Sequence, residues 1–236
     1  MENRWFRLGD RGRYAAETNL MYGIFTFTEC GGHATNEDAF TIEPHPRDSS
    51  CYVCAVADGQ GGRAGGRDAS QIACLATIET ALSYSPKQLA RPKSWPTILR
   101  AADDAVRDSP DAGFTTLVAA CITPSMVCGA SSGDSAAIVL TAGNDYQQLT
   151  QNQIKNPPVG SGVAEFITFT SPLVAPWLVL LMSDGVHKYA GWNTIASVIT
   201  QNDGQAIIDS LKLSARLPGS GEFQDDFTVL AVQNAA

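Results

Sequence analysis

Five short acidic motifs stand where predicted strands begin or end, and they limit the folds open to this chain more than any other feature. They are Asn36-Glu37-Asp38, Asp58-Gly59-Gln60-Gly61-Gly62, Gly133-Asp134-Ser135, Ser183-Asp184-Gly185 and Asp225-Asp226-Phe227-Thr228. Each motif alone is typical of a turn or a helix cap. The segments before Asp58 and Asp184 are strongly apolar, however, which places these aspartates at the rim of a core. A fold that gathers such carboxylates needs cations, because burying several together without one costs several kcal/mol apiece.

Ligands that are all oxygen favour magnesium or manganese over zinc, which prefers histidine and cysteine. The sequence contains no H-x-x-x-H pattern and no paired C-x-x-C arrangement. Cys51 and Cys54 have the C-x-x-C spacing, but on a strand positions i and i+3 face opposite sides. We therefore interpret these two cysteines as packing residues.

The overall composition is that of a folded globular protein, with 236 residues, 44% hydrophobic and 17% charged. We expect one domain of residues 20–236 after a polar lead-in of residues 1–19. The net charge of −8 argues against binding to nucleic acid or to an anionic membrane. The sequence shows no secretory signal and no apolar run of membrane-spanning length. Together with six cysteines expected to be reduced thiols, this predicts a cytoplasmic protein.

Hydrophobic periodicity predicts an α+β fold of stacked antiparallel sheets with helices around them. Helical spacing is found from residue 69 to 82, at 95–107, and in two segments near 191–201 and 203–215. Alternating or continuous apolar runs predict strands near 21–28, 38–43, 51–57, 115–122, 126–131, 136–141, 146–149, 164–170, 177–182 and 227–232. We expect the strands between 115 and 149 to form one antiparallel meander, and 51–57 to be buried on both faces.

In their order along the chain, the motifs resemble those of a known family. The series N-E-D-A-F, V-A-D-G-x-G-G, T-T-L-V-A-A, G-D-S, S-D-G-V and D-D-F-T is similar to that of the metal-dependent protein serine/threonine phosphatases, the protein phosphatase 2C group. The resemblance extends from about residue 21 to 232. It implies a compact bacterial-type member with a β-sandwich flanked by pairs of helices, a four-layer αββα arrangement.

The resemblance also implies a centre of two Mn²⁺ or Mg²⁺ ions. In the matching positions, Asp58 would bridge the two ions. The inner and outer shells would be completed by the Gly59 carbonyl, Asp38, Asp184 and Asp225. Glu37 would lie beside them, and Asp134 would help Asp184 to hold a weaker third ion. Two such cations share a water, lower its pKa and direct it at the phosphorus of phosphoserine or phosphothreonine. In this scheme Asp38 and Asp58 are catalytic.

Two positions depart from the family pattern. His33 stands where the family has a phosphate-binding arginine, and Arg63 stands where many members have a histidine proposed as the acid. Arginine does not deprotonate, but it can bind phosphate through two hydrogen bonds. One hypothesis is that the roles are exchanged, with Arg63 or Arg67 holding the phosphate and His33 donating the proton. The alternative is that His33 and Arg63 are solvated loop residues.

Two other functions remain open from the sequence. A catalytically impaired phosphatase-like module could keep the metal site for binding or regulation, and an unrelated metal-dependent hydrolase would leave the motif order unexplained. For the enzyme we expect a phosphorylated protein as substrate, a serine/threonine kinase opposing it, and a monomer. Substrate recognition does not transfer from the family, because the segment 143–177 is short for the family's flap.

Overall fold

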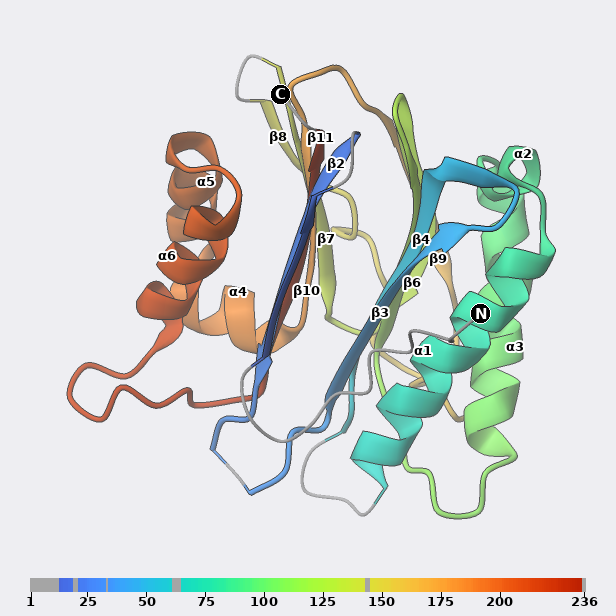
Figure 1. The fold of residues 1–236 in the computed structure, drawn as a ribbon. Helices are drawn as coiled ribbons and strands as arrows, with labels where there is room; N and C mark the ends of the chain where they lie inside the picture. Colours follow the sequence, from blue (N-terminus) through green and yellow to red (C-terminus); the bar gives the residue numbers. More distant parts are fainter. Residues whose placement is uncertain (1–12, 19–20, 33, 61–64, 143–144, 235–236) are drawn as a thin grey trace.

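Two antiparallel sheets stacked face to face form the centre of the molecule, with helices on both outer faces (Figure 1). The computed structural model describes residues 13–18, 21–32, 34–60, 65–142 and 145–234. The six-stranded sheet has the order β1 (Arg13–Thr18), β2 (Tyr22–Glu29), β11 (Phe227–Asn234), β10 (Leu178–Met182), β7 (Ala136–Thr141), β8 (Asp145–Gln148). The five-stranded sheet has the order β3 (Asp38–His45), β4 (Asp48–Asp58), β5 (Leu117–Thr123), β6 (Met126–Ser132), β9 (Ile167–Pro172). The expected α+β sandwich is confirmed.

The helices form the two outer layers. The five-stranded sheet is covered by α1 (Gly66–Ser83) and α3 (Trp95–Arg107), which also pack on each other. The short α2 (Pro86–Leu89) and the 3-10 helix η1 (Pro92–Ser94) connect them. The six-stranded sheet is covered by α4 (Asp184–Ala190), α5 (Trp192–Gln201) and α6 (Gln205–Ala215). Within the described ranges, none of these helices combines the length and the apolar character needed to cross a bilayer.

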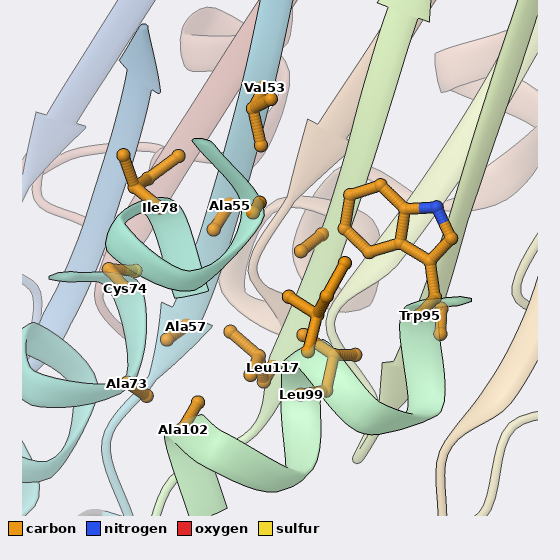
Figure 2. Packing of buried hydrophobic residues seen from close by; sticks show 14 of the residues in the cluster. Val53, Ala55, Ala57, Ala73, Cys74, Ile78, Trp95, Leu99, Ala102 and Leu117 are labelled. Atoms are coloured by element: carbon orange, nitrogen blue, oxygen red, sulfur yellow. The ribbon is translucent and has the colours of Figure 1, made fainter. Parts of the chain in front are cut away.

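Three apolar cores join the four layers, one between the sheets and one under each helical layer. Strand β4 contributes to two of them, because Val53 and Ala55 face α1 and α3 while Cys54 and Val56 face the other sheet. Figure 2 shows the face of β4 that carries Val53 and Ala55, with Trp95 of α3 packed on the same sheet. The strand is thus buried on both faces, as predicted.

The cysteines follow the same alternation of faces along β4. Cys51 lies in the core under the helices and Cys54 in the core between the sheets, so the two cannot share one ion. All six cysteines lie within the described residues, and no disulfide joins them. The interpretation of Cys51 and Cys54 as packing residues therefore holds.

Three local expectations differ from the structure. Residues 13–18, placed in the polar lead-in, form β1 and pair with β2. The periodicity predicts no helix at 184–190, but this segment forms α4, with Ser183 of the Ser183-Asp184-Gly185 motif as its N-cap. The expected meander is divided, since β5 and β6 belong to one sheet and β7 and β8 to the other. The chain changes sheets at Gly133, whose positive φ of 109° suits a residue without a side chain. Alternation predicts which face a side chain occupies, but it does not identify the sheet to which a strand belongs.

Candidate metal centre

The pairing of β3 with β4 brings together the first two acidic motifs. Asp38 is the first residue of β3, Asp58 is the last residue of β4, and the two are direct cross-strand partners. Both strands are held in the five-stranded sheet by their apolar residues, so their positions are determined by the core. The pair lies at the end of the sandwich from which α1 and α4 begin (Figure 1).

The remaining motifs reach the same end of the molecule from the other sheet. Asp184 begins α4 directly after β10, Asp225 precedes β11, and Asp134 lies where the chain crosses between the sheets. A cleft of about 370 Å³ opens here, and its walls contain aspartates from both sheets. Its lining residues are Asp58, Gly59, Gln60, Thr115, Thr116, Gly133, Asp134, Lys155, Asn156, Pro158, Asp184, Asp225 and Asp226.

The carboxylates in this cleft raise one another's pKa. Burial is the first cause of the rise at Asp58, and the charges of Asp38, Asp184, Asp225 and Asp134 add to it, so its pKa lies well above the ordinary value. Burial also raises the pKa of Asp184, with further contributions from Asp134 and Asp225. Negative charge is thus concentrated at this point, and a cation would relieve the repulsion.

Asp38 carries the strongest structural indication of a ligand. Its side chain is buried, and neither carboxylate oxygen has a hydrogen-bond partner. Burial raises the pKa of Asp38 to about 8, and the charges of Asp226 and Asp184 add to the rise. Hydrogen bonds from the nearby hydroxyls of Ser183 and Thr228 would lower the pKa of Asp38. These hydroxyls have other partners, however: that of Thr228 pairs with the Thr28 hydroxyl at 2.7 Å, and that of Ser183 donates to the Asp226 carbonyl oxygen at 3.4 Å. An unpartnered buried carboxylate among other carboxylates fits a hard cation.

The side chains alone do not complete a coordination shell. Over the described part of the chain, no three His, Cys, Asp or Glu side chains lie in positions that would hold one ion by themselves. Magnesium commonly binds through one or two carboxylates and keeps several waters. The donor set here fits that mode, in which the Gly59 carbonyl and water would supply the other oxygens.

The backbone around Gly59 is fixed by hydrogen bonds. The amide of Gly59 donates to the carbonyl oxygen of Glu37 at 3.1 Å, and the amide of Thr116 donates to the carbonyl oxygen of Asp58 at 2.8 Å. A Cβ at position 59 would lie 2.3 Å from the carbonyl oxygen of Gly66. Only glycine allows α1 to approach the cleft this closely.

Asp226 has a role that the sequence analysis did not assign. It is buried, and its two oxygens accept hydrogen bonds from the amides of Gly31 and Glu37 at 3.0 and 2.6 Å. It thereby ties the segment before β3 to the segment before β11. The doubled aspartate of the Asp225-Asp226 motif was the available signal, but nothing local separates an aspartate that faces the cleft from one that holds the backbone.

Two lysines of the site were also missed. The Nζ atom of Lys155 lies 2.6 Å from Oδ2 of Asp134, and that of Lys188 lies 3.2 Å from Oδ2 of Asp225. Lys155 lies in a loop without a family motif, and Lys188 lies in α4 two residues after the S-D-G-V motif. Of the basic residues expected to bind phosphate, His33 and Arg63 lie outside the described residues. Arg67 lies in the first turn of α1 and is not among the residues that line the cleft.

Glu37 stands beside the cleft rather than in its lining. Its carbonyl oxygen accepts hydrogen bonds from the Gly59 amide and from the Ser70 hydroxyl, at 3.1 and 2.5 Å. Its carboxyl carbon lies 3.2 Å from the place that a Cβ of Gly66 would occupy. The structure therefore brings Glu37, Asp38, Asp58, Gly59, Asp134, Asp184 and Asp225 to one end of the sandwich.

The raised pKa values lead to a prediction about stability without metal. Between pH 5 and 8, folded Asp38 keeps a proton that the unfolded chain has lost, so the folded state binds more protons. The free energy of unfolding in EDTA is therefore expected to fall as the pH rises through this range. Asp38→Asn removes the ionisable group and is expected to reduce this dependence of the unfolding free energy on pH. Urea denaturation in EDTA at pH 5 and pH 8 measures the dependence for the unaltered protein and for the variant. An equal change with pH in the two proteins would contradict the raised pKa of Asp38.

Comparison with known families identifies the class of protein. A family model described as protein phosphatase 2C matches residues 31–212. The match covers most of the chain, and the chain belongs to the protein phosphatase 2C family. The members of this family are serine/threonine protein phosphatases, which are hydrolases. No match is found among curated proteins.

Solved structures show the same fold at low sequence identity. The catalytic domain of the serine/threonine protein phosphatase PstP, solved with two manganese ions, has a TM-score of 0.74 and 20% identity, covering 92% of this chain and all of that one. RsbX in complex with magnesium has a TM-score of 0.73 and 17% identity, covering 94% and 100%. PppA, a regulatory component of the type VI secretion system in Pseudomonas aeruginosa, has a TM-score of 0.68 and 19% identity, covering 91% and 98%.

Proposed function

We propose that this protein is a metal-dependent phosphatase that hydrolyses phosphoserine and phosphothreonine in proteins. The observation that carries the proposal is the convergence of Asp58, Asp134, Asp184 and Asp225 in one cleft, with the unpartnered carboxylate of Asp38 buried close to Asp58. The family supplies the reaction class, and the cleft supplies a place where it can occur. PstP and RsbX were solved with manganese and magnesium, which supports the choice of cation.

In this proposal Asp58, the Gly59 carbonyl, Asp38, Asp184 and Asp225 would hold two Mn²⁺ or Mg²⁺ ions, with Glu37 beside them. Asp134 and Asp184 would provide a weaker third position. When bound, such cations supply Lewis acidity toward the phosphoryl oxygens and activate water.

The chain's own groups position the reaction. The hydroxyl of Thr115 donates to the carbonyl oxygen of Asp58 at 2.8 Å, and the hydroxyl of Thr116 accepts from its amide at 2.9 Å, so the backbone of Asp58 is held on both sides. The Asp226 contacts hold Glu37 and hence the start of β3. Because these hydrogen bonds already hold the backbone of the carboxylate residues in place, the site does not have to rearrange when charge develops on the substrate.

Metal removal is the direct test. Hydrolysis of p-nitrophenyl phosphate and of a phosphoserine peptide is expected with Mn²⁺, to be abolished by EDTA, and to return when Mn²⁺ is added in excess. Metal binding measured by calorimetry without turnover of either substrate would favour the catalytically impaired binding module instead. Turnover that persists in EDTA would contradict the proposed mechanism.

The cellular setting follows from the same proposal. We infer a phosphorylated protein as substrate, an opposing serine/threonine kinase, a cytoplasmic location and a monomer, with residues 20–236 and strand β1 acting as a single catalytic domain. The absence of disulfides among the six cysteines supports a reducing compartment.

The exchange of roles between His33 and Arg63 remains a hypothesis. A pH dependence of turnover that His33→Ala removes would support it, and unchanged kinetics in that variant would contradict it.

A further inference from the structure

Two lysine ammonium groups stand at the rim of the aspartate cleft. Lys155 belongs to the loop after β8 and lines the cleft, with Nζ 2.6 Å from Oδ2 of Asp134. Lys188 belongs to α4, and its Nζ lies 3.2 Å from Oδ2 of Asp225 and 3.8 Å from Oδ2 of Asp184. The two lysines therefore reach different carboxylates from separate segments of the chain.

These ion pairs contribute little to stability. The side chains of Lys155 and Lys188 are 65% and 51% exposed, and exposed ion pairs of this kind stabilise a fold little. Each ammonium group sits on a long flexible stem and can exchange one oxygen partner for another.

The charge balance of the cleft indicates what the lysines do. Asp38, Asp58, Asp134, Asp184, Asp225 and Asp226 gather at this end. When all six are ionised, as in a metal-loaded site, their carboxylates carry more negative charge than two divalent cations neutralise. A phosphate dianion entering the cleft would meet this excess and be repelled unless further positive charge lies near it. Among the lining residues that the structure describes, Lys155 is the one basic side chain, and Lys188 touches two of the lining aspartates.

We propose that Lys155 and Lys188 are binding residues for the phosphate dianion of the substrate. Each ammonium group exchanges its aspartate oxygen for a phosphate oxygen when the substrate enters the cleft. This rests on the proposed function and deepens it, because it assigns phosphate recognition to two residues that no family motif contains. No bond of the substrate is made or broken in this step.

Binding of inorganic phosphate to the full chain in saturating Mn²⁺ tests the assignment. Phosphate affinity is measured by calorimetry and, independently, as competitive inhibition of p-nitrophenyl phosphate hydrolysis. Lys155→Met and Lys188→Met keep the apolar stem and remove the charge. We expect each to weaken phosphate binding about five- to thirty-fold, the effect of losing one unit charge a few ångströms from a dianion at the protein surface. Mn²⁺ affinity, titrated separately, is expected to stay equal or to increase, because the ammonium group no longer competes for Asp134 or Asp225.

Lys87→Met is the matched control. Lys87 is exposed on α2, at the opposite end of the sandwich in Figure 1, and its removal changes the net charge by the same amount. Unchanged phosphate affinity in both cleft variants would overturn the proposal, as would an equal loss in Lys87→Met. Weaker Mn²⁺ binding together with weaker phosphate binding would also overturn it, since the lysines would then support the metal site. If the unaltered protein binds Mn²⁺ but no phosphate, this proposal and the proposed function both fail; if only the variants fail to respond, the proposed function stands.

Discussion

Asp58→Asn is expected to reduce Mn²⁺-dependent hydrolysis of p-nitrophenyl phosphate by about 10²–10³-fold, the scale seen when one group that stabilises a transition state is removed. The structure gives the reason, since Asp58 is partly buried and its carboxylate interacts with the charges of four other aspartates, Asp38, Asp184, Asp225 and Asp134. Asparagine keeps the size of the side chain but loses its charge. The fold is expected to survive, because the backbone of Asp58 is held by Thr115 and Thr116.

Asp48→Asn serves as the control for this experiment. Asp48 begins the same strand β4 at its other end, and its side chain accepts hydrogen bonds from the Ser50 amide and hydroxyl, which asparagine can also do. We expect its turnover to match that of the unaltered protein. Turnover of Asp58→Asn within tenfold of that value, with the same Mn²⁺ dependence, would show that Asp58 does not hold the cation.

Asp103→Ala is expected to lower the free energy of unfolding by about 3–5 kcal/mol, because several backbone amides lose their acceptor and each buried donor left unsatisfied costs about 1–3 kcal/mol. The Asp103 side chain is fully buried in α3. One oxygen accepts hydrogen bonds from the amides of Gly160 and Gly162 at 2.7 and 3.1 Å, and the other from Ala164 and the Arg100 guanidinium at 3.2 and 2.9 Å. Alanine would leave three backbone donors and one cation without this partner.

The effect is also expected to reach the cleft. The loop held by Asp103 includes Val159, which exchanges backbone hydrogen bonds with Thr115 at 3.1 Å, and Thr115 in turn contacts Asp58. Urea denaturation compares Asp103→Ala with Asp104→Ala, the neighbouring residue in an exposed pair with Arg107. The control is expected to change stability by no more than about 1 kcal/mol. A similar small change in both variants would mean that the loop is held by other contacts.

Much of the fold was accessible from local patterns. The apolar run 51–57 predicted a strand buried on both faces, and the helical spacing at 95–107 matches α3. These features depend on side-chain period, which is a property of neighbouring residues. The division of the meander at Gly133 was not accessible, because the choice of sheet depends on pairing between residues far apart in the chain.

The candidate site divides in the same way. The sequence alone determined that aspartates would end apolar strands, that their oxygens would suit Mg²⁺ or Mn²⁺, and that the motif order is that of one family. Only the tertiary structure decided that Asp226 holds backbone amides, that Arg67 stays out of the cleft lining, and that Lys155 and Lys188 enter the site. The physical reason is that a motif records chemistry carried by adjacent residues, whereas a charge balance is set by groups that meet only after the two sheets have stacked.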